Sequence, residues 1–278
     1  MEAAVKKTAV DRKSYRGAWD GSWDKVRQLF SNSISIIVFV VLWEIAPRVG
    51  LVPDTFIPPP SVVLSTLWDL TIQGVLLKHT VVSLGRALSG FGVAVVIAIP
   101  LGFILGGGFP LFERIVRPVL RLLGEVNVFS LFPVFILLFG IGEVSKIAMI
   151  LWVCMWPVML NTVTGVKNID PLLIKSARAM GVKGNKLFFK VVLPAASPGI
   201  FHGLKTSVGV AFFMLIAAEM IGASSGLGWL VWNAQTNYQI SKLFAATIAI
   251  SALGLSLNYL FAKLERRIIN WQEETPQY

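Results

Sequence analysis

Residues 83–106 read SLGRALSGFGVAVVIAIPLGFILG, and this stretch decides the class of fold. No charged residue occurs between Arg86 and Glu113, whereas roughly 20 apolar residues are enough to cross a hydrocarbon core about 30 Å thick. Similar runs elsewhere bring the hydrophobic residues to 55% of the chain and leave only 14% charged. The sequence therefore predicts an all-α, polytopic membrane protein.

Apolar runs of helical length predict about six transmembrane helices. Their expected ranges are 33–50, 83–106, 119–140, 145–166, 195–222 and 244–262. Between the first two, the prolines at 58–60 exclude a helix, and Ser61 is predicted to cap a short amphipathic helix that ends near Gly74. We expect an N-terminal tail over 1–32, a transmembrane domain over 33–262 and a C-terminal tail over 263–278.

The distribution of cations predicts the orientation. Of the 25 Lys and Arg residues, 19 lie in segments 1–33, 108–122, 165–190 and 262–278, which share one side if there are six spans. The positive-inside rule then places both termini and the loop 167–194 in the cytoplasm. The formal charge of +10 is thus explained by topology, and we expect no nucleic-acid partner.

The loop 167–194 is long, basic and patterned. Asp170 is predicted to cap a helix that begins at Pro171, and Gly181 is predicted to end it. One narrow face of this helix carries apolar or small residues: Leu172, Leu173, Ser176, Ala177 and Met180. Because small side chains allow close backbone approach, we interpret the segment as a docking helix for another protein.

The spacing in this loop resembles the cytoplasmic EAA loop of ABC-importer permeases, which reads E-A-A, three residues, Gly, nine residues and I-x-L-P. Here the triplet position holds Lys175-Ser176-Ala177, Gly181 follows three residues later, and residues 191–194 close the motif as VVLP. Lys175 and Ser176 depart from the motif. The resemblance implies a set of ATPase-coupling residues: Lys175, Ser176, Ala177, Ala179, Met180, Gly181, Leu193 and Pro194.

The resemblance covers residues 56–262 and is strongest to nitrate, sulfonate, taurine and bicarbonate importer permeases. It rests on further stretches, namely PPPS at 58–61, SLGR at 83–86, FGIGE at 139–143, AEM at 218–220 and GLG at 226–228. It implies a type I ABC importer permease fold in the bacterial inner membrane, surrounded by lipid. The implied partners are a second permease copy, as a homodimer or a pseudo-twofold pair, two ATPase subunits that bind ATP-Mg, and a periplasmic or lipid-anchored solute-binding protein.

Ionisable residues near apolar spans are functional candidates, because a charge there costs a few kcal/mol on insertion scales. Glu44 and Arg86 could snorkel or pair, and Glu219 could either gate the path or anchor the loop that follows it. Related permeases carry a proline-rich run where this chain has residues 124–132. We hypothesise that Glu125, Asn127 and Ser130 line the translocation path, or alternatively form a buried network between helices.

Small residues of the second predicted span indicate close helix packing. Gly85, Ser89, Gly92 and Gly102 all lie within the second span. Small side chains at such positions let transmembrane helices approach one another. We therefore expect these four positions to face neighbouring helices.

Other function classes lack the residues that they need. A membrane-embedded enzyme would require clustered nucleophiles or metal ligands, and His79 and His202 have no partner at ligand spacing, so no metal and no cofactor are expected on this chain. A G-x-x-x-x-G-K-[ST] phosphate loop is missing from the sequence, so ATP energy must enter through a partner. A channel or secondary transporter leaves the patterned loop unexplained, and pyrimidine or riboflavin-like solutes remain alternatives.

Overall fold

The computed structural model describes residues 34–107 and 110–268, which fall into two compact units divided after Ser65. In the first unit a helix covers residues 34–48. The Glu44 carboxylate accepts hydrogen bonds from the Ser61 N–H at 3.0 Å and the Ser61 hydroxyl at 2.8 Å, and it pairs with Arg48 at 2.6 Å. The prediction that Ser61 caps the next helix is wrong, because α2 (Pro60–Ile72) already includes it and its hydroxyl is bound to Glu44.

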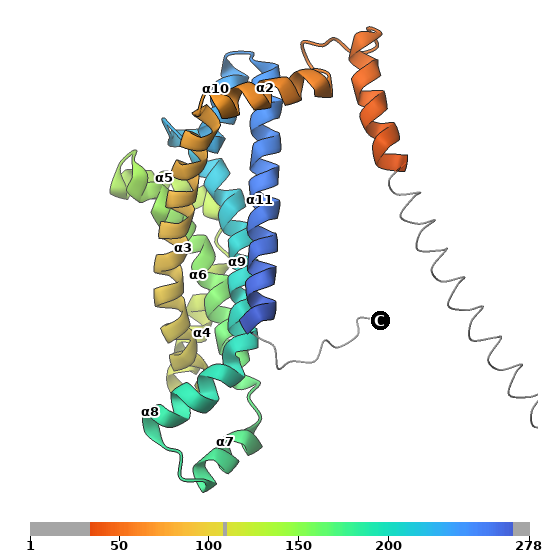
Figure 1. Ribbon diagram of the computed structural model, residues 1–278. Coiled ribbons are helices and arrows are strands. Elements are labelled where there is room, and N and C mark those ends of the chain that lie inside the picture. The colour runs from red at the N-terminus through yellow and green to blue at the C-terminus, as the bar shows by residue number, and fades with distance from the viewer. Residues whose placement is uncertain (1–33, 108–109, 269–278) are drawn as a thin grey trace, which may run out of the picture. The chain divides into compact units, whose positions relative to one another are not determined.

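The second unit is built from helices (Figure 1). They are α3 (Val75–Gly107), α4 (Pro110–Gly124), α5 (Val128–Phe139), α6 (Glu143–Lys167), α7 (Pro171–Ala179), α8 (Gly184–Leu187), the π-helical turn η1 (Phe188–Val192), α9 (Leu193–Gly222), α10 (Leu227–Thr236) and α11 (Ile240–Ile268). The described ranges contain helices, turns and no strand, which confirms the all-α prediction.

Four helical runs are long and apolar enough to cross a membrane: α3, α6, the run Gly184–Gly222 and α11. A fifth is obtained if the bent pair α4 and α5 counts as one span. The predicted number of six is not confirmed, because the helix over 34–48 is too short in its described part. The expected N-terminal tail lies outside the described residues, as do positions 269–278 of the C-terminal tail.

The predicted third span, 119–140, is wrong as a single helix. Its two halves meet at an angle of 93°, with the break between Gly124 and Val128. Asn127 explains the break, since its backbone is extended at φ −65° and ψ 117° and its side-chain oxygen accepts the Phe129 N–H at 3.0 Å. Such a capping residue begins a new helix instead of continuing the previous one.

Helix α6 forms the centre of the unit and packs against α3 on one side and α9 on the other. Glycines bring the backbones together. A Cβ atom on Gly102 would lie 2.5 Å from Thr162, and one on Gly203 would lie 2.9 Å from Asn161. The packing prediction is therefore confirmed at Gly102, whereas Gly85, Ser89 and Gly92 face no other helix of this chain within the described residues.

The helix that ends at Gly222 begins earlier than predicted. Instead of a loop up to residue 194, the chain becomes helical at Gly184 and continues through η1 into α9. The Leu193 N–H bonds to the Phe188 carbonyl, five residues back, which widens the turn just before Pro194. Proline lacks an N–H and clashes with the preceding turn of an α-helix. The π turn accommodates it without ending the helix.

Candidate functional site

Helix α7 stands at one end of the second unit, beyond the ends of α6 and α9 (Figure 1). Asp170 caps it by accepting the Leu172 N–H at 2.8 Å, and Pro171 occupies its first turn, as predicted. The chain turns away at Gly181, whose φ of +82° favours glycine. The sequence therefore fixes both ends of this helix through local backbone chemistry.

The apolar face of α7 is almost entirely uncovered. Only Ala177 is buried, whereas Met180 is 76% exposed and Leu172 is 66% exposed. Lys175, Ser176 and Ala179 are exposed as well. The remaining predicted coupling residues, Leu193 and Pro194, are half-buried where α9 begins.

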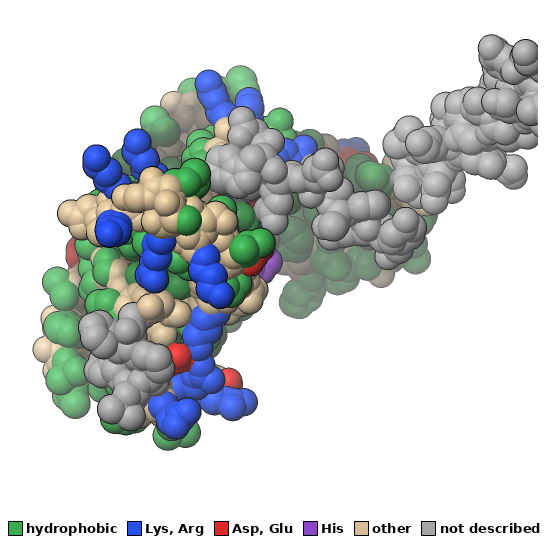
Figure 2. Space-filling view, turned by 90° about the horizontal axis from the view of Figure 1, so that it is seen from below, with side chains coloured by type: hydrophobic (Ala, Val, Ile, Leu, Met, Phe, Trp, Pro, Cys, Tyr) green, Lys and Arg blue, Asp and Glu red, His purple; other side chains and the backbone are tan. Residues whose placement is uncertain are grey.

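Cations gather around the same end of the unit. Figure 2 shows Lys and Arg side chains projecting from this face. The exposed cations on and beside α7 are Lys167, Lys175, Arg178, Lys183, Lys186 and Lys190. An uncovered apolar helix face within a basic surround has the composition of a protein-docking surface.

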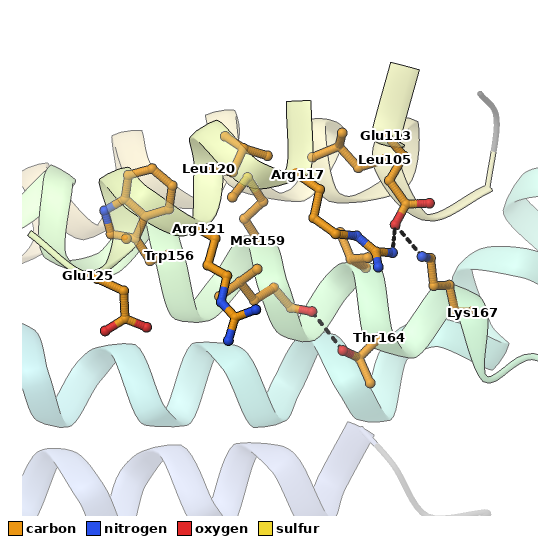
Figure 3. A pocket seen from close by; sticks show the side chains of 13 residues that line it. Leu105, Glu113, Arg117, Leu120, Arg121, Glu125, Trp156, Met159, Thr164 and Lys167 are labelled. Carbon is orange, nitrogen blue, oxygen red and sulfur yellow. Dashed lines mark hydrogen bonds and ion pairs between the residues drawn. The ribbon is translucent and has the colours of Figure 1, made fainter. Parts of the chain in front are cut away.

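A groove of about 430 Å³ lies between α4 and α6, with Leu105 of α3 at its edge (Figure 3). At one end Glu113 forms ion pairs with both Arg117 and Lys167. Further along the groove lie Arg121, near the end of α4, and Glu125, in the turn that follows α4. The walls between these charges are apolar, chiefly Leu120, Met159 and Val163.

The structure separates the four predicted path residues. Glu125 lines the groove, whereas Asn127 caps α5 and Ser130 is exposed in the first turn of α5, outside the groove lining. Glu219 is 0% exposed and lies in a different place, at the far end of α9 from α7. Of these four residues, only Glu125 lines the groove between α4 and α6.

Glu219 belongs to an ionic cluster that joins α3, α6 and α9 and is buried except at Glu143. The Arg86 guanidinium donates to Glu219 at 2.7 Å and to both carboxylate oxygens of Glu143, at 2.5 and 2.6 Å. The same guanidinium donates to the Ser225 carbonyl at 2.6 Å. Arg86 is only 4% exposed, so its charge is neutralised by contacts within the protein and not by water.

The same cluster holds the start of α10. The Glu219 carboxylate accepts the Gly228 N–H at 2.9 Å and the Ser83 hydroxyl at 2.8 Å. Ser83 in turn accepts the Leu227 N–H at 2.9 Å. A carboxylate at a helix N-terminus satisfies free N–H groups and complements the helix dipole. Glu219 thus caps a helix that follows it in the sequence.

Gly226 permits this arrangement. Its φ is +118°, and an added Cβ atom would lie 2.3 Å from the Glu219 carboxyl group. Its N–H donates to His79 Nδ1 at 2.9 Å, and the His79 ring stacks on Trp229. Sequence reasoning noted Ser83, Arg86, Glu143, Glu219 and Gly226 separately but did not predict that they meet. The sequence did place several ionisable residues at the ends of predicted spans, where each charged side chain requires a partner.

Residues 98–270, more than half of the chain, match the family described as binding-protein-dependent transport system inner membrane component. The chain belongs to this family. It is therefore an ABC importer permease subunit and a multi-pass membrane protein. This confirms the resemblance to ABC-importer permeases that the EAA-like loop indicated.

Two relatives show how far this permease similarity extends. The putative aliphatic sulfonates transport permease SsuC of Bacillus subtilis is 34% identical over 235 residues, covering 84% of this chain and 85% of SsuC. The taurine transport system permease TauC of Escherichia coli is 31% identical over 259 residues, covering 91% of this chain and 93% of TauC. Both alignments span nearly the whole of each protein.

The fold of this permease is that of a type I importer subunit. An inward-facing structure of the MetNI methionine ABC transporter matches with a TM-score of 0.61 at 18% identity, covering 71% of this chain and 98% of that chain. Because the sequence identity is low, this match is evidence for the fold alone. It confirms the fold class predicted from the sequence.

Proposed function

We propose that this permease forms the translocation path of an importer for small organic sulfonates and receives its energy from separate ATPase subunits through α7. The main support for coupling through α7 is its uncovered apolar face, on which Leu172 and Met180 are exposed beside the buried Ala177. The EAA-like spacing through Gly181 supports it. The solute class is supported by the near-full-length similarity to sulfonate and taurine permeases.

The remaining parts of the proposal concern assembly. Two permease copies, two ATPase subunits that bind ATP-Mg and an external solute-binding protein complete the importer, which lies in the bacterial inner membrane. The basic α7 end faces the cytoplasm under the positive-inside rule. ATPase closure moves α7, and the helices attached to it follow, as in other transitions by packed helices that shift together.

The coupling part is tested by isolating the tagged permease from membranes of its native host and measuring the bound P-loop ATPase by mass spectrometry. Met180→Asp and Leu172→Asp place a charge on the docking face. We expect the amount of ATPase to fall at least about tenfold, since a buried unpaired charge costs more than ~1.4 kcal/mol. A matched control is Tyr238→Asn, because Tyr238 is 87% exposed, lies at the other end of the unit and has a φ of 55° that Asn tolerates.

Retention of the ATPase by both α7 variants, or no ATPase with the folded wild-type protein, would contradict the coupling role. The solute class is tested separately by growth. A host strain without this permease should fail to grow on an organosulfonate as sole sulfur source but grow on sulfate. Equal growth on both sulfur sources would contradict a sulfonate importer.

A further inference from the structure

The N–H groups of residues 226–228 lead into α10, and each of them is bound by a side chain of another helix. Their acceptors are, in order, His79 Nδ1, the Ser83 hydroxyl and the Glu219 carboxylate, each at 2.9 Å. His79 and Ser83 lie one turn apart on α3, whereas Glu219 lies near the end of α9. The first N–H groups of a helix have no partner within it, so these three side chains fasten the start of α10 to its neighbours.

Among these three acceptors, His79 is the one whose ability to accept depends on pH near neutrality. A hydroxyl accepts at any pH, and the Glu219 carboxylate is ion-paired with Arg86 at 2.7 Å. Histidine, in contrast, ordinarily titrates between about pH 5 and pH 8. Because an amide N–H only donates, the bond from Gly226 requires a neutral imidazole whose hydrogen is on Nε2. A proton on Nδ1 turns this atom into a donor and removes the bond.

The surroundings of His79 are unfavourable for a charged ring. The residue is 7% exposed, and its ring stacks on Trp229 of α10 with 5.2 Å between the ring centroids. The cations that act on it are Lys78, the preceding residue of α3, and Lys242 of α11. Helix α10 carries no charged residue that could offset them. An imidazolium at this position would be repelled by both lysines, so protonation of the ring is coupled to its departure from the site.

The carboxylates of the neighbouring ionic cluster are already engaged. Arg86 binds Glu219 at 2.7 Å and Glu143 at 2.5 Å, and Lys146 lies 4.0 Å from Glu143. Two cations and two anions balance each other there without any contribution from His79. A positive charge on His79 would therefore be in excess beside a balanced cluster, which favours its exposure to water over its burial.

We propose that His79 is a pH-sensitive latch, which holds the N-terminus of α10 when its ring is neutral and releases it when its ring is protonated. Figure 1 shows α10 at the end of the unit opposite α7. That this end faces the exterior, where pH varies with the surroundings, rests on the proposed function, whereas the latch itself rests on the contacts of His79. Its release frees the Gly226 N–H and loosens residues 223–226, which join α9 to α10.

The test measures hydrogen exchange at residues 226–228 by mass spectrometry, with the full-length permease in nanodiscs at pH 8 and pH 5. Exchange rates are normalised to the intrinsic rate at each pH. In His79→Asn the side-chain oxygen takes the place of Nδ1 but does not titrate, and in His79→Phe a ring remains against Trp229 without an acceptor. The control is His202→Asn, because His202 is the other histidine of the sequence and lies exposed on α9. Circular dichroism and size-exclusion profiles establish that each variant is folded.

We expect the protection of these N–H groups in the wild-type protein to fall about tenfold from pH 8 to pH 5, the effect of losing about one hydrogen bond. His202→Asn should show the same fall and His79→Asn none, whereas His79→Phe should be as weakly protected at pH 8 as the wild type is at pH 5. Unchanged protection in the wild type, a fall that persists in His79→Asn or disappears in His202→Asn, or full protection in His79→Phe would each overturn the inference. None of these outcomes bears on the ATPase and growth tests of the proposed function.

Discussion

Arg86 and Glu219 form an ion pair of 2.7 Å between α3 and α9, and their side chains are 4% and 0% exposed. Arg86 also binds Glu143 at the start of α6, so one guanidinium joins three helices. Two carboxylates share this single arginine, and Lys146 lies 4.0 Å from Glu143 as a second cation. The cluster is therefore close to neutral, which is the condition under which buried charges are tolerated.

Arg86→Met should destabilise the protein by about 3–5 kcal/mol, because Glu219 would then remain buried without a compensating charge. Thermal unfolding in detergent measures the change. Lys205→Met is a matched control, since it breaks a partly exposed ion pair of 3.1 Å with Glu265 and should cost at most about 1 kcal/mol. Equal losses of stability in the two variants would show that the buried cluster has no special role.

Gly226→Ala should loosen the start of α10. The added methyl group would lie 2.3 Å from the Glu219 carboxyl group, at a backbone φ of +118° that alanine disfavours. We expect a lower unfolding temperature and faster hydrogen exchange at the first N–H groups of α10. Gly209→Ala, at a helical position with open space around the new methyl, should be neutral or slightly stabilising. Unchanged exchange in Gly226→Ala would refute the proposed constraint.

Variants of Asn127 can distinguish its role as the cap of α5 from a role in the translocation path. Asn127→Ala should cost about 1 kcal/mol, because the Phe129 N–H loses its acceptor, whereas Asn127→Ser should retain most of the stability. Growth on an organosulfonate should be the same in both variants, since the observed role of Asn127 is to cap α5. If Asn127→Ser lost growth on the organosulfonate at full stability, Asn127 would belong to the solute path.

A larger side chain on α3 should disturb its packing on α6 at Gly102 but not at Gly92. Gly102→Val would press against Thr162, whose Cβ already lies 2.5 Å from the position of an added Cβ, and should cost about 1–3 kcal/mol. Gly92→Val, in the same helix but facing open space in the described structure, should leave the unfolding temperature unchanged. Similar losses of stability in the two variants would indicate that Gly92 also packs against another helix.

The sequence predicted the features that depend on local chemistry. Asp170, Pro171 and Gly181 define α7 through its cap, its first turn and its end, so all three were readable from residue type. The long apolar runs also predicted α3, α6 and α11, apart from their exact ends. Hydropathy alone could not reveal the 93° bend, since residues 119–140 remain apolar on both sides of Asn127.

The candidate sites were harder to predict, because they depend on contacts between distant residues. Glu219 follows Arg86 by more than a hundred residues, and no periodicity relates them. A role for Glu125 in the translocation path was hypothesised from its charge in an apolar run, and this role stays a prediction. Its place near Arg121 in the groove depends on the turn past Gly124, where the Glu125 N–H donates to the Arg121 carbonyl. In the same way, the π turn at Phe188–Val192 has no clear signal apart from the nearby Pro194.

That π turn has a structural consequence. Because it preserves the helix through Pro194, the chain from Gly184 to Gly222 is one continuous helical run of 39 residues, which bends where α8 leads into α9 (Figure 1). One end of the run touches the α7 region and the other carries Glu219. No turn or extended residue interrupts the helical backbone between these two ends. One helical run therefore connects the basic α7 end of the permease to the ionic cluster that holds the start of α10.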